Sequence, residues 1–161
     1  MKKILLVLII FITACFVINT PRKDQRNFKE IFQEEMNYAE FKTYTDPDMG
    51  CSFQYPSFFS KENCDDGTCN ARFSYHANDI NMVLEFKVTY LKSSCNIYKV
   101  IVSSGEMKNY PGYCYHSHCI IYKHCCYMLS FYYPQDYKYA VTRIIRNVNK
   151  WKPCKHRQNL F

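Results

Sequence analysis

The residues best suited to chemistry lie together in one segment of thirteen residues. They are the thiols and imidazoles Cys114, His116, His118, Cys119, His124, Cys125 and Cys126. Sulfur and imidazole nitrogen are ligands that suit Zn²⁺ and Cu⁺. Side chains at alternate positions of a strand share a face, so His116 and His118 could meet Cys126 from a returning strand and hold such a metal. A thiol or metal (Zn or Cu) protein that uses the segment 113–133 is therefore one functional hypothesis.

The spacing of these groups argues against a tight metal site. The segment has no paired CxxC or HxxxH spacing, and alternate side chains on one strand lie about 6.5–7 Å apart. We therefore expect no metal and no other cofactor. His116, His118 and Cys126 remain the alternative set of metal ligands.

A hairpin is expected to position these groups. The β-rich stretch from Tyr113 to Tyr133 predicts two strands with a turn near 122–123. A two-residue turn at these positions places Cys119 opposite Cys126, whereas a slip by one residue places Cys119 opposite Cys125. The local sequence does not determine the register, so both pairings stay open.

Cysteine density suggests disulfides. The chain holds 10 cysteines, nine of them besides Cys15, and outside the cytosol such density is typical of disulfide bonding. Cys64 and Cys69 flank a turn at 66–67 that would bring them to disulfide spacing. Cys119 and Cys126 are the second candidate pair. Reduced thiols that fill the core as small apolar side chains are an equally open alternative.

No group of residues forms a recognisable catalytic arrangement. Glu30, Glu34 and Glu35 have the helical spacing of a solvated helix face, and no glycine-rich phosphate loop occurs. An activated cysteine would need an adjacent base in an electropositive, partly exposed setting, which the sequence does not display. We expect a non-enzymatic binding or accessory domain.

The first fifteen residues have the layout of an export signal. Lys2 and Lys3 form a positive start, residues 4–12 are uncharged and apolar, and two small residues follow. This order is typical of a secretory signal peptide. The last four residues, Ile12-Thr13-Ala14-Cys15, resemble a bacterial lipobox. The resemblance implies cleavage before Cys15 and attachment of lipid to its sulfur.

Lipid on Cys15 would hold the protein on a membrane of the bacterial cell envelope. Each buried CH₂ contributes about 0.8 kcal/mol, so two or three acyl chains anchor a domain essentially permanently. Residues 16–18 prolong the apolar run, which leaves an uncleaved N-terminal anchor as an alternative. The run 4–18 has 15 residues, however, and a membrane span needs roughly 20. Secretion without an anchor is the third alternative.

The chain is expected to divide into a signal peptide (1–14), a lipid anchor and tether (15–25) and one domain (26–161). Removal of the signal peptide leaves 147 of 161 residues, enough for a single core. The formal charge of +7 falls to about +5 when Lys2 and Lys3 are removed. An exported protein is not expected to meet nucleic acid. The expected partners are the membrane, through the lipid, and an unidentified envelope protein.

Hydrophobic spacing predicts the elements of the domain. In order, they are a helix over 26–41, strands over 51–55, 71–75 and 81–91, a helix from Ser93 or Ser94 to about Val102, the hairpin, and a helix from Pro134 to Trp151. The run 100–102 leaves a strand open as an alternative, and 60–70 is expected to be a loop. This order fits an α+β fold with an antiparallel sheet better than a parallel doubly wound one.

Two segments resemble PsbP-like domains. Residues 44–56, with Gly50, an alternating aromatic strand and Pro56, are similar to the opening strands of such domains. Residues 127–134, with the helix through Ile145, are similar to their closing strand and helix. The resemblance covers roughly 41–151. It implies an α-β-α sandwich with a central antiparallel sheet flanked by helices, as in small bacterial lipoproteins, and it implies no catalytic residue.

Overall fold

A computed structural model describes residues 26–64, 67–77, 80–91, 98–122 and 124–153. The predicted signal peptide, the lipobox with Cys15 and the tether lie outside the described residues, as do Cys95 and Cys154. Within the described ranges, no helix has the length and apolar character needed to cross a membrane.

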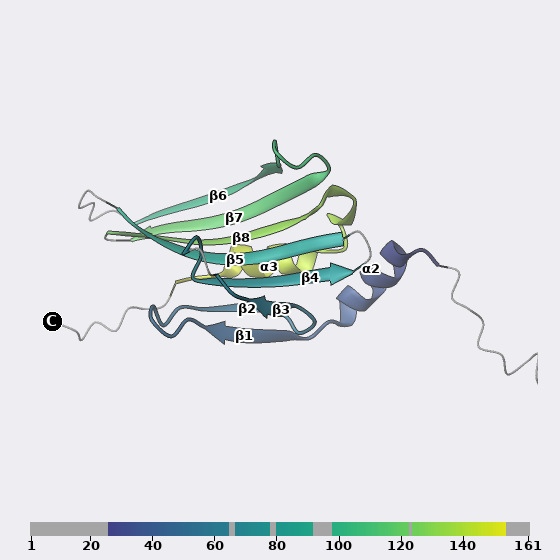
Figure 1. The fold of residues 1–161 in the computed structure, drawn as a ribbon, viewed down its shortest axis with the longest axis horizontal. Helices are drawn as coiled ribbons and strands as arrows, with labels where there is room; N and C mark the ends of the chain where they lie inside the picture. The colour runs from purple at the N-terminus through teal and green to yellow at the C-terminus, as the bar shows by residue number, and fades with distance from the viewer. Residues whose placement is uncertain (1–25, 65–66, 78–79, 92–97, 123, 154–161) are drawn as a thin grey trace, which may run out of the picture.

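The structure has an α+β fold dominated by antiparallel strands, as the sequence predicted at that level (Figure 1). Strands β1 and β2 form a small sheet, and six strands form a second sheet in the order β3-β4-β5-β8-β7-β6. The elements are α2 (Phe28–Tyr38), β1 (Phe41–Thr45), β2 (Ser52–Pro56), β3 (Ser60–Glu62), β4 (Ala71–Ala77), β5 (Ile80–Tyr90), β6 (Lys99–Glu106), β7 (Tyr113–Tyr122), β8 (Cys125–Pro134), a 3₁₀ turn (Gln135–Tyr137) and α3 (Thr142–Lys150).

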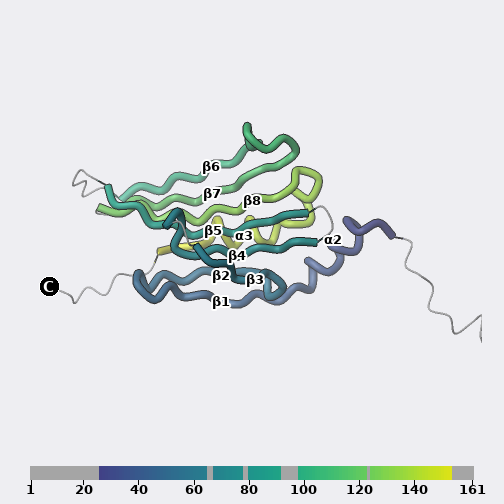
Figure 2. The backbone as a smooth tube through the Cα atoms, viewed as in Figure 1, coloured from purple at the N-terminus to yellow at the C-terminus, as the bar shows by residue number. Residues whose placement is uncertain are grey.

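One face of the six-stranded sheet carries the core. Helix α3 packs on β7 and β8 and also touches β2, and the β1–β2 pair packs beside it. Phe53 of β2 lies 5.7 Å, between ring centroids, from both Phe73 and Phe86 of the large sheet. Trp151, just after α3, contacts Phe86 at 5.8 Å. The opposite face of this sheet, which we call the open face, looks toward the viewer in Figure 2, with α3 behind the strands.

Helix α2 forms where the amphipathic spacing predicts it. The Asn27 side chain accepts a hydrogen bond from the Glu30 N–H at 2.9 Å and caps the first turn. Phe32 and Met36 are buried against the domain. At the other end, the Arg143 guanidinium of α3 donates to the Met36 carbonyl at 2.6 Å. The apolar stripe and this cross-helix bond attach α2 to the sheet domain.

Several predicted elements were wrong in type or extent. Residues 99–102 belong to strand β6 and not to a helix, because β-branched residues at 100–102 pair with β7. The predicted loop 60–70 contains strand β3. Pro134 ends β8, and α3 starts only at Thr142, since the chain first makes a 3₁₀ turn.

The register of the β7–β8 hairpin also differs from both predicted pairings. The strands pair Tyr122 with Cys125, Ile121 with Cys126 and Cys119 with Met128. Tyr122 and Cys125 are the last pair before the turn, whereas the predicted turn at 122–123 would have made 121 and 124 the last pair. Neither Cys125 nor Cys126 is directly opposite Cys119.

Candidate functional site

The two histidines of β7 point into the core under α3. His118 is 5% exposed, and its Nδ1 lies 2.8 Å from the Val148 carbonyl oxygen of α3. His116 is 8% exposed, and its Nε2 lies 2.8 Å from the Asn149 side-chain oxygen. Both imidazoles thus join β7 to the last turn of α3, which is a structural role.

The alternative metal set does not come together. Residues that pair across the hairpin share a face, and Ile121, of opposite parity to the histidines, pairs with Cys126. Cys126 therefore lies on the open face, whereas His116 and His118 lie on the core face. Among the described residues, no group of three or more His, Cys, Asp or Glu side chains could hold a metal ion.

Six of the seven described cysteines fall into three settings. Cys64 and Cys69 form a disulfide with a Cα–Cα distance of 5.7 Å, in agreement with the turn predicted between them. Cys51 and Cys114 are buried in the hydrophobic core, where a thiol acts as a small apolar side chain. On the open face, the Sγ atoms of Cys119 and Cys126 lie 2.7 Å apart although the two residues are diagonal neighbours.

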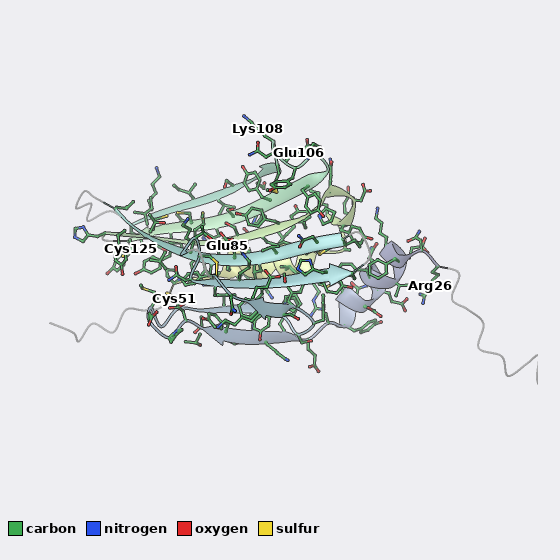
Figure 3. All side chains as sticks on the ribbon, in the orientation of Figure 1. Arg26, Cys51, Glu85, Glu106, Lys108 and Cys125 are labelled. Atoms are coloured by element: carbon green, nitrogen blue, oxygen red, sulfur yellow. A yellow bond between two sulfur atoms is a disulfide. The ribbon has the colours of Figure 1, made fainter. Side chains whose placement is uncertain are left out.

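Cys125 is separated from this pair by the sheet. It pairs with Tyr122 and so lies on the core face, at the end of the hairpin, where Figure 3 labels it. Its thiol contacts the Tyr127 hydroxyl. The pKa of Tyr127 is raised mainly by burial and, to a smaller extent, by this contact with Cys125. Sequence alternation alone could separate Cys125 from Cys126, but it could not say which of them Cys119 would meet.

A polar row crosses the open face. Paired positions of neighbouring strands place the following residues in one line: Glu62, Arg72, Glu85, Ser130, Ser117 and Ser103. Arg72 and Glu85 form an ion pair at 2.8 Å, and the Ser117 and Ser130 hydroxyls lie 2.7 Å apart. Glu85 is labelled near the middle of the sheet in Figure 3. Arg72 with Glu85, and Ser117 with Ser130, thus satisfy each other across the strands.

A hydroxyl, a carboxylate and an imidazole, the three groups of a hydrolytic triad, lie together at Ser74, Glu62 and His76. Their order of contact differs from that of a triad. The Ser74 hydroxyl donates to a Glu62 carboxylate oxygen, and the same oxygen lies 3.0 Å from His76 Nε2. The hydrogen bond from Ser74, and to a smaller extent the bond with His76, holds the pKa of Glu62 below its ordinary value. In a triad the imidazole stands between the hydroxyl and the carboxylate. Here the carboxylate stands between them, so this arrangement does not activate the serine.

An exposed apolar surface lies on the core face of the sheet, where α3 no longer covers it. Tyr90 and Tyr122 both pair with Cys125, and Tyr122 makes an edge contact with Tyr98 at 6.4 Å. Val100 and Val102 continue this surface along β6. The exposed fractions are 68% for Tyr90, 36% for Tyr122, 64% for Tyr98, 45% for Val100 and 51% for Val102. We call these five residues the aromatic ledge.

The β6 strand that carries the ledge is an edge strand. It stands last in the strand order, pairs with β7, and is exposed along its whole length. Sequence analysis missed the ledge as a surface, although Val100-Ile101-Val102 was its signal. The run predicted a helix end or a strand, but not that its side chains would be exposed.

A shallow groove of about 480 Å³ lies between the start of β1 and α3. Arg143 and Arg146 line one side of it, and Glu40 and Gln54 line the other. The Arg143 guanidinium already binds the α2 carbonyls and stands 5.1 Å over the Phe41 ring. The groove therefore has mainly a packing role, and the aromatic ledge is the stronger candidate for a functional surface.

No family model, curated protein or solved structure matches this chain.

Proposed function

We propose that this protein is an exported, lipid-anchored domain of the bacterial cell envelope that acts without catalysis, by binding another protein at the aromatic ledge. The anchor is Cys15, and the domain is a PsbP-like α+β domain. The single observation that carries the binding proposal is the aromatic ledge, with three tyrosines and two valines exposed on one face of the large sheet. Exposed apolar groups that adjoin one another are typical of interaction surfaces, and tyrosine is enriched in the residues that dominate binding.

The edge of β6 adds a second means of binding at the same place. An edge strand presents unpaired backbone N–H and C=O groups along its outer side. An extended segment of a partner can add to such an edge, with its side chains contacting alternate residues of the strand. Here those residues would be Val100 and Val102 on one face and Ile101, 39% exposed, on the other.

The position of the ledge favours a protein over the lipid surface. The described chain enters the domain at α2, whereas β6 begins at the opposite end of the long axis (Figure 1). If Cys15 holds the N-terminus at a membrane, the ledge faces away from it. On the open face, Arg72 pairs with Glu85 and Ser117 with Ser130, as expected for groups that stabilise the sheet.

The test combines localisation with a binding assay in cells. We expect a labelled lipid precursor to be incorporated into the wild-type chain and not into Cys15→Ser. A photo-cross-linking residue at Ile101 should give a discrete protein adduct that disappears when Val102→Asp is added. Tyr139, 83% exposed and outside the ledge, provides the matched control position, and a cross-linker there should not give that adduct.

Two outcomes would overturn the proposal. Unchanged lipid labelling of Cys15→Ser would remove the anchor. Two results would contradict a protein partner at the ledge. One is an adduct at Ile101 that persists in Val102→Asp, and the other is binding of the purified, unlipidated chain to phospholipid vesicles through the ledge.

A further inference from the structure

The fold brings the thiols of Cys119 and Cys126 into contact across strands β7 and β8. Their Sγ atoms lie 2.7 Å apart, closer than two unbonded sulfur atoms normally approach and about 0.7 Å longer than a disulfide bond. Both residues are half-buried on the open face. The chain also holds the Cys64–Cys69 disulfide, so it is compatible with an oxidising compartment.

We propose that Cys119 and Cys126 form a dithiol site that exchanges with disulfides and closes into a reversible cross-strand disulfide between β7 and β8. The co-reactant is a disulfide of the form R–S–S–R, either a small molecule or the disulfide of another protein. This proposal does not depend on the proposed binding at the aromatic ledge, whose five residues lie on the other face, although Ile101 of the β6 edge pairs with Cys119.

The exchange proceeds in two balanced steps. In the first, a cysteine thiolate attacks one sulfur of R–S–S–R, a mixed disulfide forms, and one RS⁻ leaves and takes up a proton. In the second, the neighbouring thiol loses its proton and attacks the cysteine sulfur of the mixed disulfide, so that a second RS⁻ leaves. The two cysteines are oxidised by two electrons, and R–S–S–R is reduced to two thiols.

The two thiols act as a pair. Burial, and then the contact with Cys126, raises the pKa of the Cys119 thiol, and two thiols in contact lose their protons as a pair and not independently. Either thiol can therefore make the first attack. The other thiol lies in contact with the sulfur that then carries the mixed disulfide, and it completes the exchange.

The fold also selects Cys126 over its neighbour Cys125. Cys125 pairs with Tyr122 on the core face, and a bond from it to Cys119 would have to cross the sheet. Closure of the pair would cross-link β7 to β8 near their turn. It would thereby hold the end of the sheet from which β6 extends.

The experiment treats the full chain with oxidised glutathione and maps cysteines by mass spectrometry without reductant. Trypsin cuts after Lys123, between peptide 109–123 with Cys114 and Cys119 and peptide 124–138 with Cys125 and Cys126. We expect the wild-type chain to lose two hydrogen atoms and the two peptides to stay joined until a thiol reductant is added. Fragmentation of the joined peptides should place the bond between Cys119 and Cys126, without the need for any variant.

Single variants separate the roles of the cysteines. We expect neither Cys119→Ser nor Cys126→Ser to give joined peptides, because each variant leaves one thiol of the pair without the other. The matched control, Cys125→Ser, should still join the peptides. Joined peptides in Cys119→Ser, a bond located at Cys125, or a Cys119 that remains open to alkylation in the treated wild type would each overturn the proposal.

Discussion

Replacement of His118 with leucine should stabilise the domain. His118 is 5% exposed and bonds through Nδ1 to the Val148 carbonyl at 2.8 Å. Its second ring nitrogen, Nε2, is buried and has no hydrogen-bond partner among the described atoms. A buried polar atom without a partner costs about 1–3 kcal/mol. Leucine removes this cost and keeps an apolar side chain of similar size at the site.

The expected gain follows from the bonds that are lost and kept. Loss of the Nδ1 bond costs about 1 kcal/mol. The Val148 carbonyl is not left unpaired, because the Trp151 N–H also donates to it at 3.3 Å. The edge contact between the His118 and Trp151 rings, 6.0 Å apart, is replaced by aliphatic contact. The net change is a stabilisation of about 1 kcal/mol, which raises Tm by roughly 3 °C in a domain of this size.

Urea denaturation followed by tryptophan fluorescence measures this change, since Trp151 adjoins the site. Ser130→Ala is the matched control, because it removes a buried hydroxyl that does have a partner, Ser117 at 2.7 Å. This control should destabilise the domain by about 1 kcal/mol. A loss of 2 kcal/mol or more in His118→Leu would refute the reasoning, since it would mean that Nε2 binds a group and that His118 serves a site.

Two further predictions concern the covalent and ionic links. Replacement of Cys64 and Cys69 by serine opens a loop with a sequence separation of 5 and should lower the free energy of unfolding by roughly 2 kcal/mol, measured by urea denaturation; an unchanged value would contradict this. The pKa of Glu62 is lowered in the folded state. The ionised Glu62 therefore stabilises the folded domain above the ordinary carboxyl pKa, and this contribution is lost as pH falls through the pKa that Glu62 has in the folded state. Ser74→Ala should raise the pKa of Glu62, seen by NMR titration, and should reduce the loss of stability between neutral and acidic pH; an unmoved Glu62 would show that the Ser74 bond does not form.

Local patterns in the sequence were sufficient for α2, for the strands near 51–55, 71–75 and 81–91, and for the Cys64–Cys69 disulfide. Each depends on residues close in the chain: a helical apolar stripe, a two-residue alternation, or a tight turn. The α+β class with antiparallel strands followed from their order. The PsbP-like sandwich and the lipid anchor at Cys15 stay predictions.

Only the tertiary structure decided what the cysteines and histidines of the hairpin do. The two candidate registers differed from each other by one residue, and one such slip exchanges the faces of a whole strand. The packing of α3 against His116 and His118 establishes which face is buried, and thus puts Cys126 beside Cys119 on the open face. The same packing covers β7 and β8 but leaves β6 exposed, so the side chains of Val100, Ile101 and Val102 lie at the surface. No local pattern could show this, because it depends on where a helix forty residues later comes to lie.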